Sequence, residues 1–349
     1  MKSEPSELLF INFKVDSKDP VLGFAPRIIK EFSKEFKSTT VLTGFFSGEK
    51  IAENVTVIST NWVPGHDLRN VSRFYYQLIK LLIKAKPGLC YTHQAAPQAV
   101  LAAPFMKLFR IKQILWYASV SNSWAIKSAN KLMDRLVTST RLSKPFESEK
   151  YFVIGQAIQT EDISRKTTFT KKSFLNFVNV GRLDPSKNFE NIINSIKEQT
   201  EIDSFTLNHF GATTENSGEY KKLLESTFAE EVNSGQIKLN GGIEYSTLVN
   251  TYAKFDLFIH SFDGSLDKVL IEALAGGIPV ITTNRAFKEI FGSWHTRINV
   301  TLNEELKSFL ATSEEEINAK LVNQRQILGS QHSLQTFPHR IRQQFNALG

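Results

Sequence analysis

The chain has 349 residues, a formal net charge of +7 and 41% hydrophobic residues, enough for two domains or one large one with real cores. Its one cysteine, Cys90, excludes a disulfide framework, and its seven histidines show no metal-site spacing. The start lacks the pattern of a signal peptide, and the longest apolar stretch, "AVLAAPFM", is too short to span a bilayer. We therefore expect a soluble or peripheral protein.

The charge is uneven along the chain. Residues 1–168 carry 24 Lys and Arg against 14 Asp and Glu, a net of +10, whereas residues 169–349 carry 18 against 21, a net of −3. A basic half favours an anionic partner such as a phosphorylated substrate or an anionic lipid surface; an accidental imbalance is the alternative. Nucleic-acid binding is disfavoured because the cations are dispersed, without a basic-aromatic repeat.

Apolar runs typical of strands alternate with helical patterns from one end of the chain to the other. The first half has runs at 8–15, 39–43, 55–60, 89–93, 113–118, 135–140 and 151–155. The pattern restarts with runs at 177–183, 205–211, 237–242, 256–260 and 279–283. Continuously apolar strands separated by helices predict α/β domains whose parallel sheets are covered on both faces.

A polar and basic stretch without periodicity, "ISRKTTFTKK" (163–172), separates the two halves. We interpret it as a linker between two doubly wound domains, 1–168 and 169–331. Two such domains form a cleft, and ligands of doubly wound sheets bind at the carboxyl ends of the strands. The loops after the strands are therefore where function is expected.

The clearest chemical signal is "NVGRLDPSKNFENIINSI". The strand ends at Gly181, Ser186 is the expected N-cap, and helical periodicity follows. Arg182 and Lys187 then lie beside a helix amino terminus, whose free N–H groups and dipole favour anions. An ordinary surface turn is the alternative, but it would place a cation against the dipole without a reason.

The second signal is "SFDGSLDKVLIEALAGGIPVIT" (261–282). With a helix starting near Asp267, a small loop containing Gly264 precedes it, and its amides can approach phosphate oxygens. Glu272 lies one turn deeper and is placed to accept hydrogen bonds from vicinal hydroxyls such as those of ribose. The alternative is a Lys268–Glu272 salt bridge on a solvated helix face, worth a few tenths of a kcal/mol.

Further candidates lie at strand ends of the first half. The loop "DSKDPVLGF" (16–24), shaped by Pro20 and Gly23, follows the first strand and is not a dinucleotide fingerprint. His93 and Ser119 follow two other strands. A histidine that ends a strand is more often structural than catalytic, but strand ends are also where a ligand would bind.

The two second-half motifs resemble the donor-binding half of glycosyltransferase family 4, retaining enzymes with the GT-B fold, in a branch with a GSLDK-type motif. "DPVLGF", "LWYASVS", "DRLVTST" and "YFVIGQAIQTEDI" are similar to first-domain and crossover segments of a bacterial and archaeal branch. "QHSLQTFPHRIRQQF" is similar to its closing helix, expected at about 332–349, which crosses back to the first domain.

The resemblance implies a role for each matching position. Arg182 and Lys187 would hold the diphosphate of a nucleotide sugar and stabilise the leaving group, and Glu272 would bind the ribose. The other implied donor-binding residues are Gly181, Gly264, Ser265, Leu266, Asp267 and Lys268. Gly23, His93 and Ser119 would lie on the acceptor or sugar side. No metal and no cofactor is expected, because the two cations supply the electrostatic stabilisation.

The resemblance therefore implies a cytoplasmic retaining hexosyltransferase that transfers a sugar from a nucleoside-diphosphate sugar to a glycan or lipid-linked glycan, in the synthesis of surface polysaccharide or glycoconjugate. The basic amphipathic stretch 73–86 is a candidate for peripheral contact with anionic lipid at the inner face of the membrane, and a core-facing helix is the alternative.

Two positions depart from the family pattern. Gly264 replaces the first glutamate of a Glu-x7-Glu pattern, and Ser119 replaces a histidine used near the transferred sugar. A hydroxyl cannot act as a base near neutral pH. A non-catalytic relative that binds a nucleotide sugar or a partner protein is thus an alternative. A sugar-nucleotide epimerase shares the architecture and would work without an acceptor; a phosphorylase would need a much longer chain.

Overall fold

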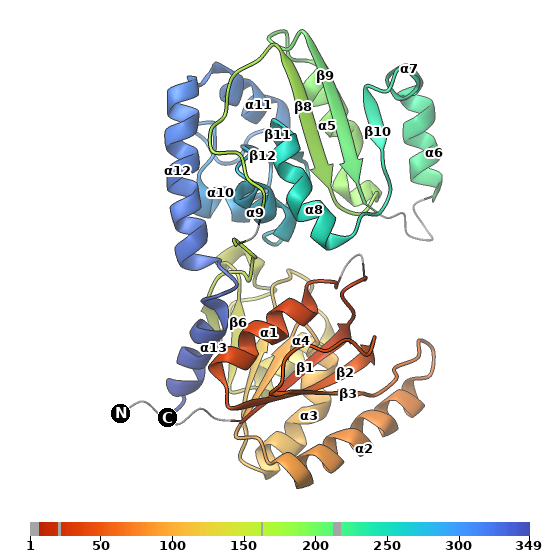
Figure 1. The fold of residues 1–349 in the computed structure, drawn as a ribbon, viewed down its shortest axis with the longest axis vertical. Coiled ribbons are helices and arrows are strands. Elements are labelled where there is room, and N and C mark those ends of the chain that lie inside the picture. Colours follow the sequence, from red (N-terminus) through yellow and green to blue (C-terminus); the bar gives the residue numbers. More distant parts are fainter. Residues whose placement is uncertain (1–6, 20–21, 162, 212–217) are drawn as a thin grey trace. The chain divides into compact units, whose positions relative to one another are not determined.

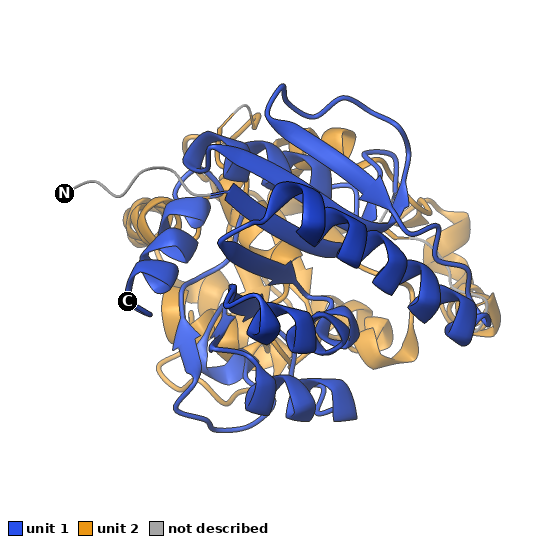
Figure 2. Ribbon diagram, turned by 90° about the horizontal axis from the view of Figure 1, so that it is seen from below, with its two compact units in different colours: residues 1–157, 334–349 blue, residues 158–333 orange. Residues whose placement is uncertain are grey.

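The computed structural model describes residues 7–19, 22–161, 163–211 and 218–349, which form two compact units. Unit 1 comprises residues 1–157 with 334–349, and unit 2 comprises residues 158–333; Figure 2 shows them in blue and orange. The predicted linker belongs to unit 2 rather than between the units, because Lys166 is bound there. Its Nζ lies 2.8 Å from Asp256, and its backbone N–H donates to the carbonyl of Gly276.

Unit 1 is built on a seven-stranded, all-parallel sheet with the order β3-β2-β1-β4-β5-β6-β7. Each strand coincides with a run predicted from the sequence, within a few residues. The strands are β1 (Glu7–Val15), β2 (Ser38–Phe46), β3 (Val55–Ser59), β4 (Leu89–His93), β5 (Lys112–Trp116), β6 (Arg135–Thr138) and β7 (Tyr151–Val153).

Helices cover both faces of this sheet because successive residues of a strand point to opposite sides. Phe10 of β1 packs with buried side chains of α1 and α13, whereas Leu9 and Ile11 pack with those of α2 and α3. Figure 1 labels these helices around the sheet. The helices of unit 1 are α1 (Ala25–Glu35), α2 (Asp67–Ala85), α3 (Ala96–Leu108), α4 (Trp124–Leu132), the 3₁₀ turn η1 (Arg141–Ser143) and α13 (Phe337–Asn346).

Helix α13 completes the core of unit 1, although unit 2 separates it from the rest of that unit in the sequence. The ring of Phe337 lies 6.1 Å from those of both Phe32 and Trp116, and Ile341 and Phe345 are buried with it. The predicted return of the C-terminal helix to the first domain is therefore present in the fold.

Unit 2 repeats the arrangement with a five-stranded parallel sheet in the order β10-β9-β8-β11-β12. Its strands are β8 (Phe174–Val180), β9 (Ser204–Phe210), β10 (Ile237–Leu239), β11 (Leu257–His260) and β12 (Val280–Thr282). Its helices are η2 (Pro185–Lys187), α5 (Phe189–Lys197), α6 (Gly218–Thr227), α7 (Ala229–Asn233), α8 (Tyr245–Thr251), η3 (Tyr252–Lys254), α9 (Lys268–Ala275), α10 (Arg285–Phe291), α11 (Leu302–Ala311) and α12 (Glu314–Gln331).

The chain reversal after α9 explains the paired glycines of the second motif. Gly277 has a φ of +79°, and a Cβ at this position would lie 2.1 Å from the carbonyl oxygen of Lys166. Only glycine accepts both this φ and this close approach without strain. Among the described residues, no helix is long and apolar enough to cross a membrane.

Candidate functional site

The candidate site of unit 2 lies at the carboxyl ends of two neighbouring strands, β8 and β11. The strand order reverses between them, because β9 follows on the far side of β8 and β12 on the far side of β11. Ligands of open α/β sheets bind at such a reversal. The loop after β8 carries Gly181, Arg182 and Lys187, and the loop after β11 carries residues 264–268. The sheet therefore brings the two predicted motifs together.

The loop after β8 is shaped by Asp184 rather than Ser186. The Asp184 carboxylate accepts the backbone N–H of Ser186 and caps the 3₁₀ turn η2, which ends at Lys187. Asn188 then adopts the left-handed conformation, with a φ of 48°, and α5 begins at Phe189. The predicted N-cap at Ser186 is thus wrong: an Asp–Pro–Ser sequence closes its own turn before the helix can start.

The two predicted cations have different surroundings. Arg182 is exposed and makes no hydrogen bond or ion pair with the described part of the chain, so its guanidinium is available to a ligand. Lys187 is mostly buried. Its Nζ lies 2.6 Å from the Asp267 carboxylate and 3.9 Å from the centre of the Phe262 ring. The pair therefore offers one unpartnered cation and one that is already engaged.

Asp267 is the electrostatic centre of the second loop. It is the N-cap residue of α9, and besides Lys187 its carboxylate lies 3.3 Å from Nε2 of His260, a buried residue of β11. Burial opposes ionisation of Asp267, but His260 and Lys187 outweigh it and hold the pKa of Asp267 below its ordinary value. Burial lowers the pKa of His260, against the opposing effect of Asp267. In this cluster of three side chains, the Asp267 carboxylate thus lies between the neutral imidazole of His260 and the ammonium of Lys187.

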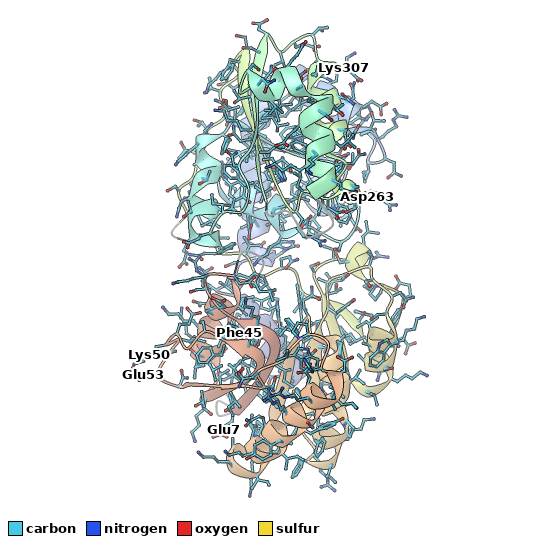
Figure 3. The ribbon with its side chains drawn as sticks, turned by 90° about the vertical axis from the view of Figure 1, so that its right-hand side faces the viewer. Glu7, Phe45, Lys50, Glu53, Asp263 and Lys307 are labelled. Carbon is cyan, nitrogen blue, oxygen red and sulfur yellow. The ribbon has the colours of Figure 1, made fainter. Side chains whose placement is uncertain are left out.

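Side-chain amides hold the second loop in place. Asn284 donates to the carbonyl oxygens of Phe262 and Ser265, at 3.3 and 3.1 Å. Asn191 of α5 donates to Ser261, at 2.9 Å. A further anchor is the ion pair of Asp263 with Arg285, at 2.7 Å; Figure 3 labels Asp263 in this loop. Sequence reasoning missed both asparagines: Asn284 follows β12 by two residues, whereas Asn191 lies in the first turn of α5, where no strand-end signal marks it.

The structure gives a reason for Gly264 where the family pattern has a glutamate. A Cβ at this position would lie 2.7 Å from the Phe262 ring, which supports the ammonium of Lys187. A larger residue would displace the ring and with it the cation. Of the other predicted loop residues, Leu266 is buried in the core beneath the loop, while Ser265 and Lys268 are partly exposed.

Glu272 is buried inside unit 2, with 2% of its surface exposed. Its Oε1 accepts no hydrogen bond, and the buried hydroxyl of Tyr252 likewise has no hydrogen-bond partner. Burial raises the pKa of Glu272, and the Lys268 charge opposes this. The Lys268–Glu272 pair exists, at 3.9 Å, but not on a solvated helix face, so that interpretation is wrong. Oε1 is therefore a buried acceptor that has a cation nearby but no hydrogen-bond donor, and it can accept a hydrogen bond from a polar ligand.

The candidate residues of unit 1 surround the ends of β1, β4 and β5. Gly23 is buried, and a Cβ there would lie 2.5 Å from the carbonyl oxygen of Asp19; Pro20 lies outside the described residues. His93 is stacked on Trp116, with ring centres 4.6 Å apart, and its Nδ1 lies 2.8 Å from the Tyr91 hydroxyl. Ser119 Oγ accepts the backbone N–H of Ser121 at 3.2 Å.

A comparison with known families bears on this site. Residues 159–323 match the family described as Glycosyl transferases group 1. The matched segment covers nearly all of unit 2 and contains every candidate from Gly181 to Glu272. No curated protein sequence gives a significant match to the chain.

Solved structures resemble the chain along its whole length. HepE from Anabaena, in complex with UDP and glucose, is 15% identical, with a TM-score of 0.72 over 98% of this chain and 100% of its own. A glycosyltransferase from Rickettsia africae is 13% identical, with a TM-score of 0.74 over 98% of each chain. UDP-GlcNAc 2-epimerase from Methanocaldococcus jannaschii is 14% identical, with a TM-score of 0.60 over 98% and 100%. The likeness confirms the predicted α/β fold, two Rossmann-like domains of GT-B architecture.

Proposed function

We propose that this protein is a retaining glycosyltransferase of family 4, which moves a hexose from a nucleoside-diphosphate sugar to a glycan or lipid-linked glycan in the synthesis of surface polysaccharide or glycoconjugate. The observation that carries the proposal is the pairing of two cations with the buried carboxylate of Glu272, whose Oε1 accepts no hydrogen bond, near the strand reversal of unit 2. These groups lie inside the segment that matches group 1 glycosyltransferases.

Arg182 and Lys187 would bind the diphosphate and neutralise the charge that grows on it as its bond to the sugar C1 breaks. Glu272 Oε1 would accept a ribose hydroxyl, and the backbone of residues 264–268 would meet the phosphates and the sugar. The acceptor oxygen forms its bond to C1 on the face that the diphosphate leaves, and the hydroxyl proton passes to a leaving phosphate oxygen. The protein supplies charge stabilisation and orientation rather than acid–base chemistry.

The acceptor would meet the basic unit 1, with Gly23, His93 and Ser119 near the sugar. Helix α2 supports peripheral contact with an anionic membrane at the cytoplasmic face. It buries Phe74, Leu78 and Leu81, so one face is core, yet it also exposes apolar side chains beside its cations. These exposed side chains are Leu68, Tyr76, Ile79 and Ile83.

The decisive experiment is thermal unfolding with UDP, GDP, ADP, CMP and dTDP. A nucleotide at about 100 times its dissociation constant adds roughly 2.7 kcal/mol to the free energy of unfolding. We expect one nucleotide to stabilise the wild type and the Arg182→Ala/Lys187→Ala variant to lose the effect. Lys221→Ala/Lys222→Ala, which removes two cations from α6, should keep it. If none of the nucleotides stabilises the wild type, Arg182 and Lys187 do not bind a nucleotide-sugar donor.

Ser119 supports one alternative, a non-catalytic relative that binds the donor without turnover. The two functions separate in a product assay with the stabilising nucleotide's sugar donors. Transfer to an added glycan acceptor supports the transferase. Binding without any product supports the non-catalytic relative, and conversion of the donor without acceptor would identify an epimerase.

A further inference from the structure

Unit 1 contains a cavity of about 180 Å³ that is remote from the strand ends carrying His93 and Ser119. It lies at the other end of the same strands, their amino ends, where α3 ends and β5 begins. Lys107, Arg110 and Lys112 line it, together with the carboxylate of Asp134 and apolar groups that include Met106 and Leu132. We call it the α3-edge cavity.

The cations of the α3-edge cavity outnumber its carboxylate. The side chains of Lys107 and Arg110 make no hydrogen bond or ion pair with the described part of the chain. Lys112 donates to the carbonyl of Gly349, and Asp134 accepts the backbone N–H of Gln113, at 2.7 Å. Two unpartnered cations therefore remain beside one carboxylate that is already hydrogen-bonded. This balance favours an anion of the size of a phosphate group.

The backbone conformation of Arg110 is energetically unfavourable for a residue other than glycine. Its φ is 56°, in the left-handed region, where a residue with a Cβ is roughly 1–2 kcal/mol less stable than glycine. Glycine or asparagine would end α3 there without that penalty. The turn that ends α3, in which the Ile111 N–H donates to the carbonyl of Met106 at 2.8 Å, requires this conformation, and it places the arginine rather than a glycine at the cavity.

Two exposed apolar side chains lie between Lys107 and Arg110 in the sequence. Leu108 is 74% exposed and Phe109 is 49% exposed. The carboxyl end of α2 lies at the same edge, because α2 and α3 precede the neighbouring parallel strands β4 and β5. That end exposes Ile83, at 67%, next to Lys84. Apolar groups beside cations fit the boundary between phosphate headgroups and acyl chains.

We propose that the α3-edge cavity binds the headgroup phosphate of an anionic phospholipid, with Leu108 and Phe109 entering the apolar layer below the headgroups. A soluble phosphate ester would use the same cations but would gain nothing from the exposed Leu108 and Phe109. The site stands on α3 and does not require the donor chemistry proposed for unit 2.

The test is flotation with vesicles of phosphatidylcholine, with or without phosphatidylglycerol. We expect binding only to the anionic vesicles, weakening as salt rises. Each cation near an anionic surface contributes roughly fivefold in affinity, so Lys107→Ala/Arg110→Ala should lose about thirtyfold. Lys30→Ala/Lys34→Ala, which removes two exposed cations from α1, should lose far less. Leu108→Ser/Phe109→Ser should weaken binding without changing the charge.

Three results would overturn the proposal. The first is equal binding to neutral and anionic vesicles. The second is a Lys107→Ala/Arg110→Ala variant that floats like the α1 control. The third is stabilisation of the wild type by glycerol phosphate, lost in that variant, without vesicle binding, which would assign the cavity to a soluble phosphate. Thermal unfolding of each variant checks folding, and the nucleotide shift of unit 2 is measured separately.

Discussion

At the scale of single residues, Asp267 is the anion that a donor phosphate would compete with for the ammonium of Lys187 in the unit 2 site. Its carboxylate holds the ammonium of Lys187 at 2.6 Å and is itself held in the ionised form. Under the proposed function, an incoming diphosphate would have to take Lys187 from this resident anion. Binding would then exchange one ion pair for another, which would limit the affinity and ease release of the product diphosphate.

Replacement of this resident anion gives a first prediction. Asp267→Asn should bind the stabilising nucleoside diphosphate roughly tenfold more tightly, because a charge next to the phosphate site is removed and Lys187 is released. Calorimetric titration measures the change. Asp263→Asn, which removes a carboxylate of the same loop that pairs with Arg285 instead, is the control. Weaker binding by Asp267→Asn would show that Asp267 positions Lys187 rather than competing for it.

Glu272 gives a second prediction, in which stability and binding change in opposite directions. Burial raises its pKa, so between the unfolded and folded pKa values the folded state holds the extra proton, and stability falls as pH rises. Glu272→Gln should therefore raise the free energy of unfolding by about 1 kcal/mol at pH 8, with a smaller gain at pH 5. The same variant should bind nucleotide roughly tenfold more weakly, because a carboxylate is the stronger acceptor.

Denaturant unfolding at both pH values, with and without nucleotide, measures both effects. Glu244→Gln, at an exposed position before α8, is the control and should change neither quantity. A loss of stability by Glu272→Gln at pH 8 would mean that the carboxylate has partners that offset its burial.

At the scale of elements, the turn after α9 packs against Lys166 of the predicted linker and holds that segment in unit 2. Gly277→Ala should destabilise unit 2 by more than about 3 kcal/mol, because its Cβ meets a backbone oxygen as well as requiring a positive φ. Gly235→Ala is the matched control: its φ is +76°, but only the end of the Lys238 side chain lies near, at 3.9 Å. It should lose about 1 kcal/mol. Equal losses in denaturant unfolding would contradict the steric argument.

The strands could be predicted from the sequence because both faces of a parallel sheet are buried, so that each strand appears as one unbroken apolar run. The run at 89–93 coincides with β4, Leu89–His93, at both ends. The cap of α5 could not be predicted, because Asp184, Ser186 and Asn188 all have side chains that end or begin turns, and tertiary contacts choose among them.

The site was only partly predictable for a related reason. The sequence placed Arg182, Lys187 and residues 264–272 on two loops, but it could not show that Lys187 pairs with Asp267, 80 positions away. Periodicity assigned Glu272 to a solvated face, as one interpretation, because Lys268 stands four residues before it. Residues 270–275 of α9 are in fact buried on every side, which an 8-residue helix does not reveal by its spacing.

At the scale of the whole molecule, the two units have separate cores, and α13 belongs to unit 1. Phe337→Ala should destabilise unit 1 by roughly 3–5 kcal/mol, because a fully buried ring is lost from a packed site. Hydrogen exchange should show faster exchange of amides in residues 7–157, while those of unit 2 and its nucleotide binding stay unchanged. Leu223→Ala, at an exposed position of α6, is the control. A uniform loss of protection across both units would show that they unfold together.

The path of the chain through the units has a consequence for biosynthesis. A ribosome releases the sheet of unit 1 first, but the helix that covers Phe32 and Trp116 emerges only after all of residues 158–333 have been made. At roughly 5–20 residues per second, this apolar surface waits for roughly ten to thirty seconds. The continuous unit 2 can fold during that interval. Unit 1 is thus started first and completed last, and its apolar surface around Phe32 and Trp116 stays uncovered until α13 has been made.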